Sequence, residues 1–327
     1  MNILFLIGNG FDLNLGMKTR YSDFYKHYVS IKTSSSLIQK LKNEIGGNLE
    51  NWSDLELALG EYTRNLSSTE EFNEVFEDIE DSLADYLELV ESNFDFKQFD
   101  GKKLYKYFVF PEYSLPPADK NRLKSFKNKW SHSRWNLNII TFNYTQSLEK
   151  LINYTGKSLQ INDFTNRSNN SPVVFQKLEH VHGYINERMV MGVNDVSQVS
   201  NSDFHSNQDV IESLIKSECN QAQKHTMDNW CKDQISKANL ICIFGSSIGD
   251  TDNLWWQLMG EQLKRDCYLI IFEKGEVIPP RRPQKGKIAE RNKKKYFLGK
   301  TNLTEKEKEG ADKKIFIGIN TNMFNIS

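Results

Sequence analysis

Four short motifs combine the small, amide and imidazole groups that bind nucleotides and transfer protons. The first runs from Gly8 through Asn9 and Gly10 to Asp12, directly after an apolar run. Glycines in such a turn let the backbone approach phosphate oxygens, and the amides of a following helix add partial positive charge. An ordinary strand-to-helix turn has the same composition. The dinucleotide fingerprint GxGxxG is not met, because its third glycine falls on Leu13.

The second and third motifs supply an amide and two imidazoles. Thr141 closes an apolar run, and Asn143 follows it at a position where asparagine can cap a helix, bind a ribose hydroxyl or hold a water. His180 and His182 are two residues apart and face the same side of an extended chain. A metal site is disfavoured because the spacing places no third ligand. We prefer one functional histidine, suited to proton transfer near neutral pH.

The fourth motif is a second turn of small residues. It runs from Gly245 through Ser246 and Ser247 to Asp250. The amides and hydroxyls of such a turn can bind phosphate. The alternative is an ordinary helix start that is capped by Asp250 or Thr251.

Five short apolar runs predict the buried strands that position these motifs. They are Asn2–Ile7, Leu137–Phe142, Leu240–Phe244, Tyr268–Phe272 and Lys314–Gly318. Continuous rather than alternating apolar runs are typical of strands covered on both faces, as in a parallel sheet. Open parallel sheets bind ligands at the carboxyl ends of their strands. The sequence therefore predicts an α/β protein in which the four motifs surround a common cleft.

The residues between the first two predicted strands are mostly helical in pattern. Ser68 with Glu71 forms a capping-box pattern, and apolar residues then recur at helical spacing from Phe72 to Val90. This pattern predicts an amphipathic helix. We interpret residues 25–130 as a large helical insertion after the first strand. The core would then comprise residues 1–24 and 131–327.

Composition excludes several classes of function. The 327 residues carry 42 basic and 43 acidic side chains, so the whole molecule does not attract nucleic acid or membranes by charge. No apolar run approaches the ~20 residues of a membrane span, and the start of the chain lacks the pattern of a signal peptide. We expect a cytoplasmic protein. Residues 281–295 hold eight basic side chains and one acidic one, which is typical of a solvated surface.

The motifs and their order resemble a known family. The segments are GNGFDLNLGMKTRYSDF at 8–24, NWSDLE at 51–56, FNYT at 142–145, HVHG at 180–183 and FGSSIGDTD at 244–252. Together they resemble the bacteriophage abortive-infection AbiH family. The resemblance extends over most of the chain and implies a role in phage defence.

The same motifs are similar, more distantly, to those of sirtuins and of sirtuin-like NAD hydrolases of phage defence. Gly8, Gly10 and Gly16 fall on the three glycines of the sirtuin motif GAGxSxxxGIPxFR. Thr141 and Asn143 fall on the threonine and asparagine of the motif TQNxD. His182 with Gly183 matches the motif HG, and Gly245 to Ser247 match the motif GTS. This resemblance implies a Rossmann-like, sirtuin-like parallel sheet flanked by helices. It also implies NAD as substrate or ligand, with no metal.

The sirtuin resemblance also implies residue roles. Asn143 would bind the nicotinamide ribose or orient the attacking water, and His182 would be the general base on a ribose hydroxyl. The two glycine turns would hold the pyrophosphate and the adenosine side. The expected dinucleotide-binding set is Gly8, Asn9, Gly10, Asp12, Thr141, Gly245, Ser246 and Ser247.

The chain departs from the sirtuin pattern at the nicotinamide end. Asp12 replaces the serine of the first motif, and Thr145 replaces the aspartate of the second. The arginine of the first motif would fall on Tyr21, next to Arg20. The four-cysteine zinc module of sirtuin deacetylases is absent, so protein deacylation is disfavoured.

Three functions are compatible with these observations, in order of preference. The first is an NAD glycohydrolase whose activity stops the growth of an infected cell. The second, motivated by the departures at positions 12 and 145, is a non-catalytic nucleotide-binding sensor. The third is an effector that acts on nucleic acid through residues 281–295, which we disfavour. Self-assembly into a homo-oligomer and a phage-derived trigger are the two means of regulation considered, and the sequence identifies neither.

Overall fold

The computed structural model describes residues 1–165, 172–224 and 226–325. Its centre is a seven-stranded sheet with the strand order β3-β4-β2-β1-β5-β6-β7. The strands are β1 (Asn2–Ile7), β2 (Asn136–Thr141), β3 (Leu159–Thr165), β4 (Pro172–His180), β5 (Leu240–Phe244), β6 (Tyr268–Glu273) and β7 (Ile315–Ile319). The predicted α/β class is confirmed.

Parallel pairing extends through most of the sheet. Among the described strands only β3, at one edge, runs antiparallel to its neighbour β4. The five predicted strands are confirmed as β1, β2, β5, β6 and β7, each with ends within one residue of the prediction. The sequence did not predict β3 and β4. Without β3, the parallel strands numbered in chain order lie in the order 3-2-1-4-5-6.

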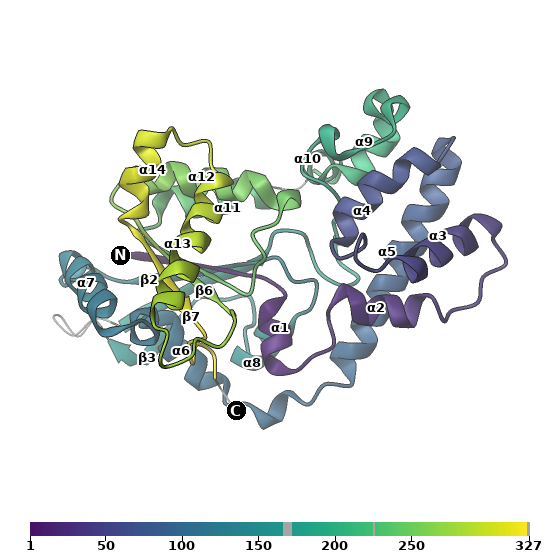
Figure 1. Cartoon of the computed structure of the whole chain (residues 1–327). Coiled ribbons are helices and arrows are strands. Elements are labelled where there is room, and N and C mark those ends of the chain that lie inside the picture. The colour runs from purple at the N-terminus through teal and green to yellow at the C-terminus, as the bar shows by residue number, and fades with distance from the viewer. Residues whose placement is uncertain (166–171, 225, 326–327) are drawn as a thin grey trace.

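Helices cover both faces of the sheet (Figure 1). Ile3 and Phe5 of β1 pack on one face with the helices α6 (Gly101–Val109), α7 (Pro117–Lys127) and α8 (Ser147–Ile152). Leu4 and Leu6 pack on the other face with α11 (Met227–Lys237), α12 (Asn253–Leu263), α13 (Gln284–Gly299) and α14 (Glu305–Asp312). Because alternate side chains of a strand point to opposite faces, burial on both sides requires the continuous apolar runs seen in the sequence.

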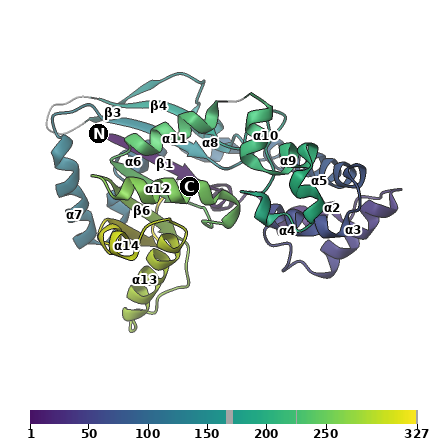
Figure 2. The same cartoon turned by 90° about the horizontal axis from the view of Figure 1, so that it is seen from above.

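The remaining helices form a helical lobe beside the sheet, as Figures 1 and 2 show. The lobe comprises α2 (Tyr21–Tyr28), α3 (Ser36–Gly47), α4 (Leu55–Tyr62), α5 (Thr69–Ser92), α9 (Gln208–Leu214) and α10 (Lys216–Ala222). The predicted amphipathic helix is confirmed as α5, whose apolar face is buried in a core of the lobe. Since α6 and α7 pack on the sheet and α9 packs in the lobe, the division of the chain at 25–130 stays a prediction.

The basic segment 281–295 lies mostly in α13. Lys293 pairs with Glu273 at 2.6 Å, and Lys294 pairs with Glu290 at 3.7 Å. Part of the positive charge of the segment is therefore neutralised within the protein. In the part of the chain that the structure describes, no helix is both long and apolar enough to span a lipid bilayer.

Candidate functional site

A cleft of about 740 Å³ lies where the carboxyl ends of β1, β2, β4 and β5 face the helical lobe. Its walls include nine of the predicted site residues: Gly8, Asn9, Gly10, Asp12, Asn143, His182, Gly245, Ser246 and Ser247. Tyr21, Trp52 and Leu83 line it from the lobe. The structure thus brings together motifs from strand ends that are far apart in sequence. We term this cavity the main cleft.

The two glycine turns pack directly against each other at the centre of the sheet. The amide of Gly8 donates to the carbonyl of Phe244 at 2.9 Å, and the amide of Gly10 donates to the carbonyl of Gly245 at 2.7 Å. A Cβ atom on Gly10 would lie only 2.4 Å from the Cα of Gly245. Glycine is therefore required for contact between the turns. The role of these glycines in binding a ligand stays a prediction.

The side chain of Asn9 organises the loop that follows α1 (Gly10–Leu15). Its Nδ2 donates to the carbonyl of Thr19 at 2.7 Å, and its Oδ1 accepts from the Thr19 hydroxyl at 2.5 Å. Arg20 and Tyr21 follow Thr19 and line the main cleft. Asn9 thus shapes one wall of the cleft through Thr19.

Asp12 is buried beneath the first turn, with only 1% of the residue exposed. One carboxylate oxygen accepts from the Thr145 hydroxyl at 2.5 Å, and the other accepts from the Ser147 hydroxyl. Burial raises the pKa of Asp12 to about 6, although the hydrogen bonds from Ser147 and Thr145 lower it. The two positions that depart from the expected motif pattern therefore hydrogen-bond to each other inside the protein.

Asn143 reaches the main cleft from the loop after β2. Its backbone amide donates to Oγ1 of Thr141 at 3.1 Å, and this hydroxyl donates to the carbonyl of Ile7 at 3.2 Å. Thr141 itself is 2% exposed and lies beneath the cleft wall, where it positions Asn143.

The side chain of Asn143 has a free acceptor. Its Oδ1 is buried and has no hydrogen-bond partner among the described residues. The helix α8 begins four residues later, at Ser147, so Asn143 does not cap it. Since buried polar atoms are almost always hydrogen-bonded, this oxygen in a cleft wall suits a ligand hydroxyl or a water.

His180 is held by partners within the protein. Its Nδ1 lies 2.7 Å from the carbonyl oxygen of Asn143, and its Nε2 lies 2.5 Å from Oε1 of Glu149. Burial alone would lower the pKa of His180, but the hydrogen bond and charge of Glu149 outweigh it and raise the pKa. His180 is thus the structural histidine of the pair, and it fixes the backbone next to Asn143.

His182 is the histidine that faces the main cleft. Its Nε2 lies 2.7 Å from Oδ1 of Asp252, and its Nδ1 is buried without a partner among the described residues. An ionised carboxylate only accepts hydrogen bonds, so Nε2 carries a proton, and in the neutral imidazole the free lone pair is on Nδ1. The ring of Phe142 packs beside the imidazole, with 5.6 Å between ring centroids. The arrangement suits proton acceptance at Nδ1.

Asp252 belongs to a buried charge network that joins the sheet to the helical lobe. The Nζ atom of Lys216, on α10, donates to Oδ1 of Asp252 at 2.9 Å and to Oε2 of Glu56, on α4, at 2.8 Å. The hydroxyl of Tyr144 donates to Oε1 of Glu56 at 2.9 Å. His182 is therefore connected to two helices of the lobe through Asp252.

The network keeps Asp252 and Lys216 ionised. Burial would raise the pKa of Asp252, but the charge of Lys216, together with the hydrogen bonds from His182 and Lys216, outweighs burial and holds it well below its usual range. Burial would lower the pKa of Lys216, but Asp252 and Glu56 raise it above its usual value. Asp252 is consequently an anion at neutral pH and a constant hydrogen-bond acceptor for His182.

Carboxylates outnumber cations around the main cleft. The acidic residues that line it are Asp12, Asp54, Glu56, Asp250 and Asp252, and Arg20 is the basic residue among the described lining residues. Burial, reinforced by the charge of Glu56, raises the pKa of Asp54. The resulting negative field favours a group that gains positive charge during a reaction.

The turn after β5 offers backbone donors. Oγ of Ser246 accepts from the amide of Ile248 at 3.1 Å. The amides of Ser246 and Ser247 donate to no partner within the described part of the chain. The helix that follows, α12, starts at Asn253 without a side-chain cap. The alternative interpretation of this turn, a helix start capped by Asp250 or Thr251, is therefore wrong.

Sequence analysis missed Glu56, Lys216 and Asp252 as site residues. Glu56 and Asp252 are the last residues of the segments NWSDLE and FGSSIGDTD, so the motifs contained them without indicating their role. Lys216 lies in a polar helical stretch and carries no motif signal. Only the fold brings it next to the other two.

Comparison with known proteins identifies a family for most of the chain. The sequence model of a family described as "Bacteriophage abortive infection AbiH" matches residues 4–273. This segment contains every lining residue of the main cleft except Tyr296. No curated protein matches the chain.

Proposed function

The chain belongs to the bacteriophage abortive infection AbiH family, and from this premise we propose that it acts in phage defence by hydrolysing NAD in the main cleft. In this reaction the bond between C1′ of the ribose and the nicotinamide nitrogen breaks, and water adds to C1′. The products are nicotinamide, ADP-ribose and one proton. Depletion of NAD stops the growth of the infected cell.

The observation that carries the proposal is the pairing of His182 with Asp252 in the wall that also contains Asn143. Both residues line the main cleft, and Nδ1 of His182 and Oδ1 of Asn143 are buried atoms without a hydrogen-bond partner among the described residues. One atom accepts a proton and the other accepts a hydrogen bond. These are the two functions needed to activate and orient a water or a ribose hydroxyl.

The charge of the main cleft suits this chemistry. Nicotinamide is cationic within NAD and leaves as a neutral molecule, so its departure requires no acid. The ribose then carries positive charge, which Asp54 and Asp252 stabilise from the cleft wall. Asn143 orients the incoming hydroxyl, and Nδ1 of His182 takes the released proton. Arg20 and the amides of Ser246 and Ser247 bind the diphosphate.

The strand order supports a Rossmann-like, sirtuin-like dinucleotide-binding sheet. The order 3-2-1-4-5-6 is that of doubly wound sheets that bind dinucleotides where the order reverses. Here the reversal lies between β1 and β5. The Gly8 and Gly245 turns follow these two strands and line the main cleft.

Nicotinamide release from NAD tests the proposal. Purified protein is incubated with NAD, alone and with lysate from phage-infected cells, and nicotinamide and ADP-ribose are quantified by mass spectrometry. We expect both products in equal amounts. His182→Ala should lower the rate about 10²–10⁴-fold, the contribution of a positioned general base.

His132 offers a matched control because it is an exposed histidine outside the described pockets. His132→Ala should keep the wild-type rate. Equal rates for His182→Ala and wild type would remove His182 from the mechanism. The absence of products under every condition would reject NAD hydrolysis.

A second candidate is a nucleotide-binding sensor without turnover. The network that links His182 to α4 and α10 favours it, because a ligand in the cleft would act on the helical lobe through Asp252 and Lys216. Calorimetric binding of NAD or ADP-ribose without product formation, with or without infected lysate, would select the sensor over the hydrolase.

A further inference from the structure

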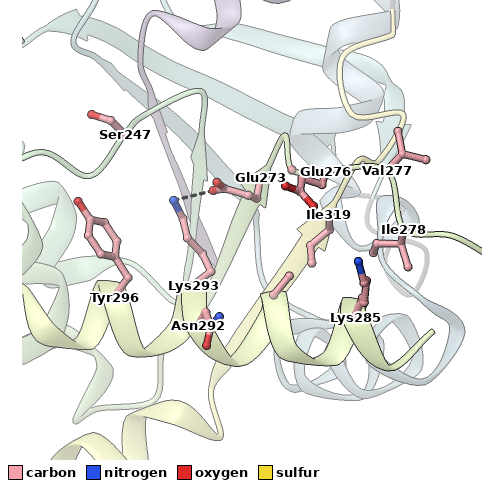
Figure 3. A pocket seen from close by; sticks show the side chains of 12 residues that line it. Ser247, Glu273, Glu276, Val277, Ile278, Lys285, Asn292, Lys293, Tyr296 and Ile319 are labelled. Carbon is pink, nitrogen blue, oxygen red and sulfur yellow. Dashed lines mark ion pairs between the residues drawn. The ribbon is translucent and has the colours of Figure 1, made fainter. Parts of the chain in front are cut away.

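A second pocket adjoins the main cleft along the sheet edge. It has a volume of about 490 Å³, within the range of small-molecule sites. Ser247 and Tyr296 line both cavities, so the two are neighbours. Figure 3 shows Ser247 and Tyr296 at one end, the Glu273–Lys293 ion pair in the middle, and Val277 at the other end. We term this cavity the side pocket.

The far walls of the side pocket are aliphatic. Val277 and Ile278 come from the loop after β6, Ala289 comes from α13, and Ile319 ends β7. Val277 is 86% exposed. Together these four side chains form an aliphatic wall against which a flat apolar ring can pack.

The charges of the side pocket cancel. Lys293 pairs with Glu273 at 2.6 Å, and Lys285 and Glu276 add one charge of each sign. A phosphate would find no net positive charge here. An uncharged group with apolar faces and polar edges fits better, and Asn292 supplies donors and acceptors for such edges.

We propose that the side pocket binds the adenosine half of the dinucleotide. This inference rests on the proposed function. The base lies against the aliphatic wall, and the Glu273 carboxylate at the end of β6 accepts hydrogen bonds from the ribose hydroxyls. The diphosphate passes the Ser247 turn, and the nicotinamide half lies in the main cleft next to His182. Ser247 and Glu273 lie within the family match, and the other walls of the side pocket come from residues beyond 273.

Filling the pocket tests its occupancy. Ala289→Trp places an indole in the side pocket from an exposed position of α13. Ile288→Trp is the control, because it adds the same indole at a neighbouring exposed position outside the described pockets. Adenosine monophosphate is titrated calorimetrically into the wild type and both variants, with ribose 5-phosphate as the ligand without a base. We expect Ala289→Trp to raise the Kd for adenosine monophosphate about tenfold or more, a ~1.4 kcal/mol loss. Ile288→Trp should leave it unchanged.

Removing one ribose hydroxyl tests the Glu273 contact. The wild type should bind adenosine monophosphate more tightly than 2′-deoxyadenosine monophosphate, and Glu273→Gln should reduce this preference. Nicotinamide mononucleotide, which lacks the adenosine half, should be hydrolysed equally by the wild type and Ala289→Trp. Adenosine monophosphate that binds Ala289→Trp as tightly as wild type, or that fails to bind wild type, would overturn the inference. Either result leaves nicotinamide release from NAD as the separate test of the proposed function.

Discussion

The Nε2 atom of His182 lies 2.7 Å from the Oδ1 atom of Asp252, although 70 residues separate them in the chain. Asp252 is held ionised by Lys216, so the hydrogen bond fixes the imidazole with its proton on Nε2 and its free lone pair on Nδ1.

Asp252→Asn should remove the fixed orientation of His182. An asparagine amide can donate to Nε2 and leave the proton on Nδ1, where it blocks base catalysis. We expect the rate of nicotinamide release to fall about 10²–10⁴-fold. Asp266→Asn is the matched control, because Asp266 pairs with Lys129 on the surface and lies outside the main cleft. If both variants retained the wild-type rate, Asp252 would have no part in catalysis.

Lys216→Met should destabilise the fold strongly. The lysine separates two buried carboxylates, those of Glu56 and Asp252, and its loss leaves them without the cation that neutralises both. Removal of one partner from a buried ion pair costs about 3–5 kcal/mol of unfolding free energy. Urea unfolding of the purified variant measures the loss. The double variant Lys216→Met with Glu56→Gln should recover part of it, and a loss below about 1 kcal/mol for the single variant would argue against the network.

Asp12 should make stability depend on pH between about 4 and 6. Burial raises its pKa from 3.8 to about 6, so the folded state binds a proton that the unfolded state has released in this range. Stability that Asp12 contributes is therefore present below pH 4 and is lost as pH rises to 6. The shift corresponds to roughly 3 kcal/mol.

The test compares wild type with Asp12→Asn by urea unfolding at pH 4 and pH 7.5. Relative to the variant, the wild type should lose about 2–3 kcal/mol on going to the higher pH. Asp85→Asn, on the exposed side of α5, is the control for general effects of charge. A difference that stays constant with pH would show that Asp12 does not take up a proton in the folded protein.

Gly245→Ala should destabilise the contact between the two glycine turns. Gly245 has φ +71°, and a Cβ there would lie 2.7 Å from the amide nitrogen of Phe11. The left-handed backbone costs ~1–2 kcal/mol and overpacking ~1–3 kcal/mol, so we expect a loss of about 2–5 kcal/mol. Gly16 has φ +93° but open space around it, so Gly16→Ala should lose only the free energy of the left-handed backbone. Equal losses for the two variants in urea unfolding would show that the turns do not pack tightly.

Much of the fold was predictable because burial on both faces forces continuous apolar strands. Five strands were identified in this way. The strands β3 and β4 were not identified. In β4, Lys177 and Glu179 interrupt the apolar run, and they form an ion pair with each other instead of packing in the core. An edge region with one solvated side does not carry the signal of a central strand.

The candidate site was predictable where residues follow strand ends, and not where they come from the lobe. Asn143 follows the end of β2, and His182 follows the end of β4. Because β2 and β4 are neighbouring parallel strands, the sheet brings the two residues to the same cleft. Lys216 reaches Asp252 only because α10 packs at the sheet edge, a contact that no local pattern indicates. Thr141 and Asn9 were predicted as ligand contacts, and their observed hydrogen bonds show that they also organise the walls.

The most direct test of NAD hydrolysis is nucleotide profiling by mass spectrometry in cells that express the wild type or Asn143→Ala, with and without phage. We expect infection to lower NAD and to raise nicotinamide and ADP-ribose in wild-type cells, while cells with Asn143→Ala keep their NAD. Unchanged NAD in infected wild-type cells that nevertheless stop growing would contradict this expectation.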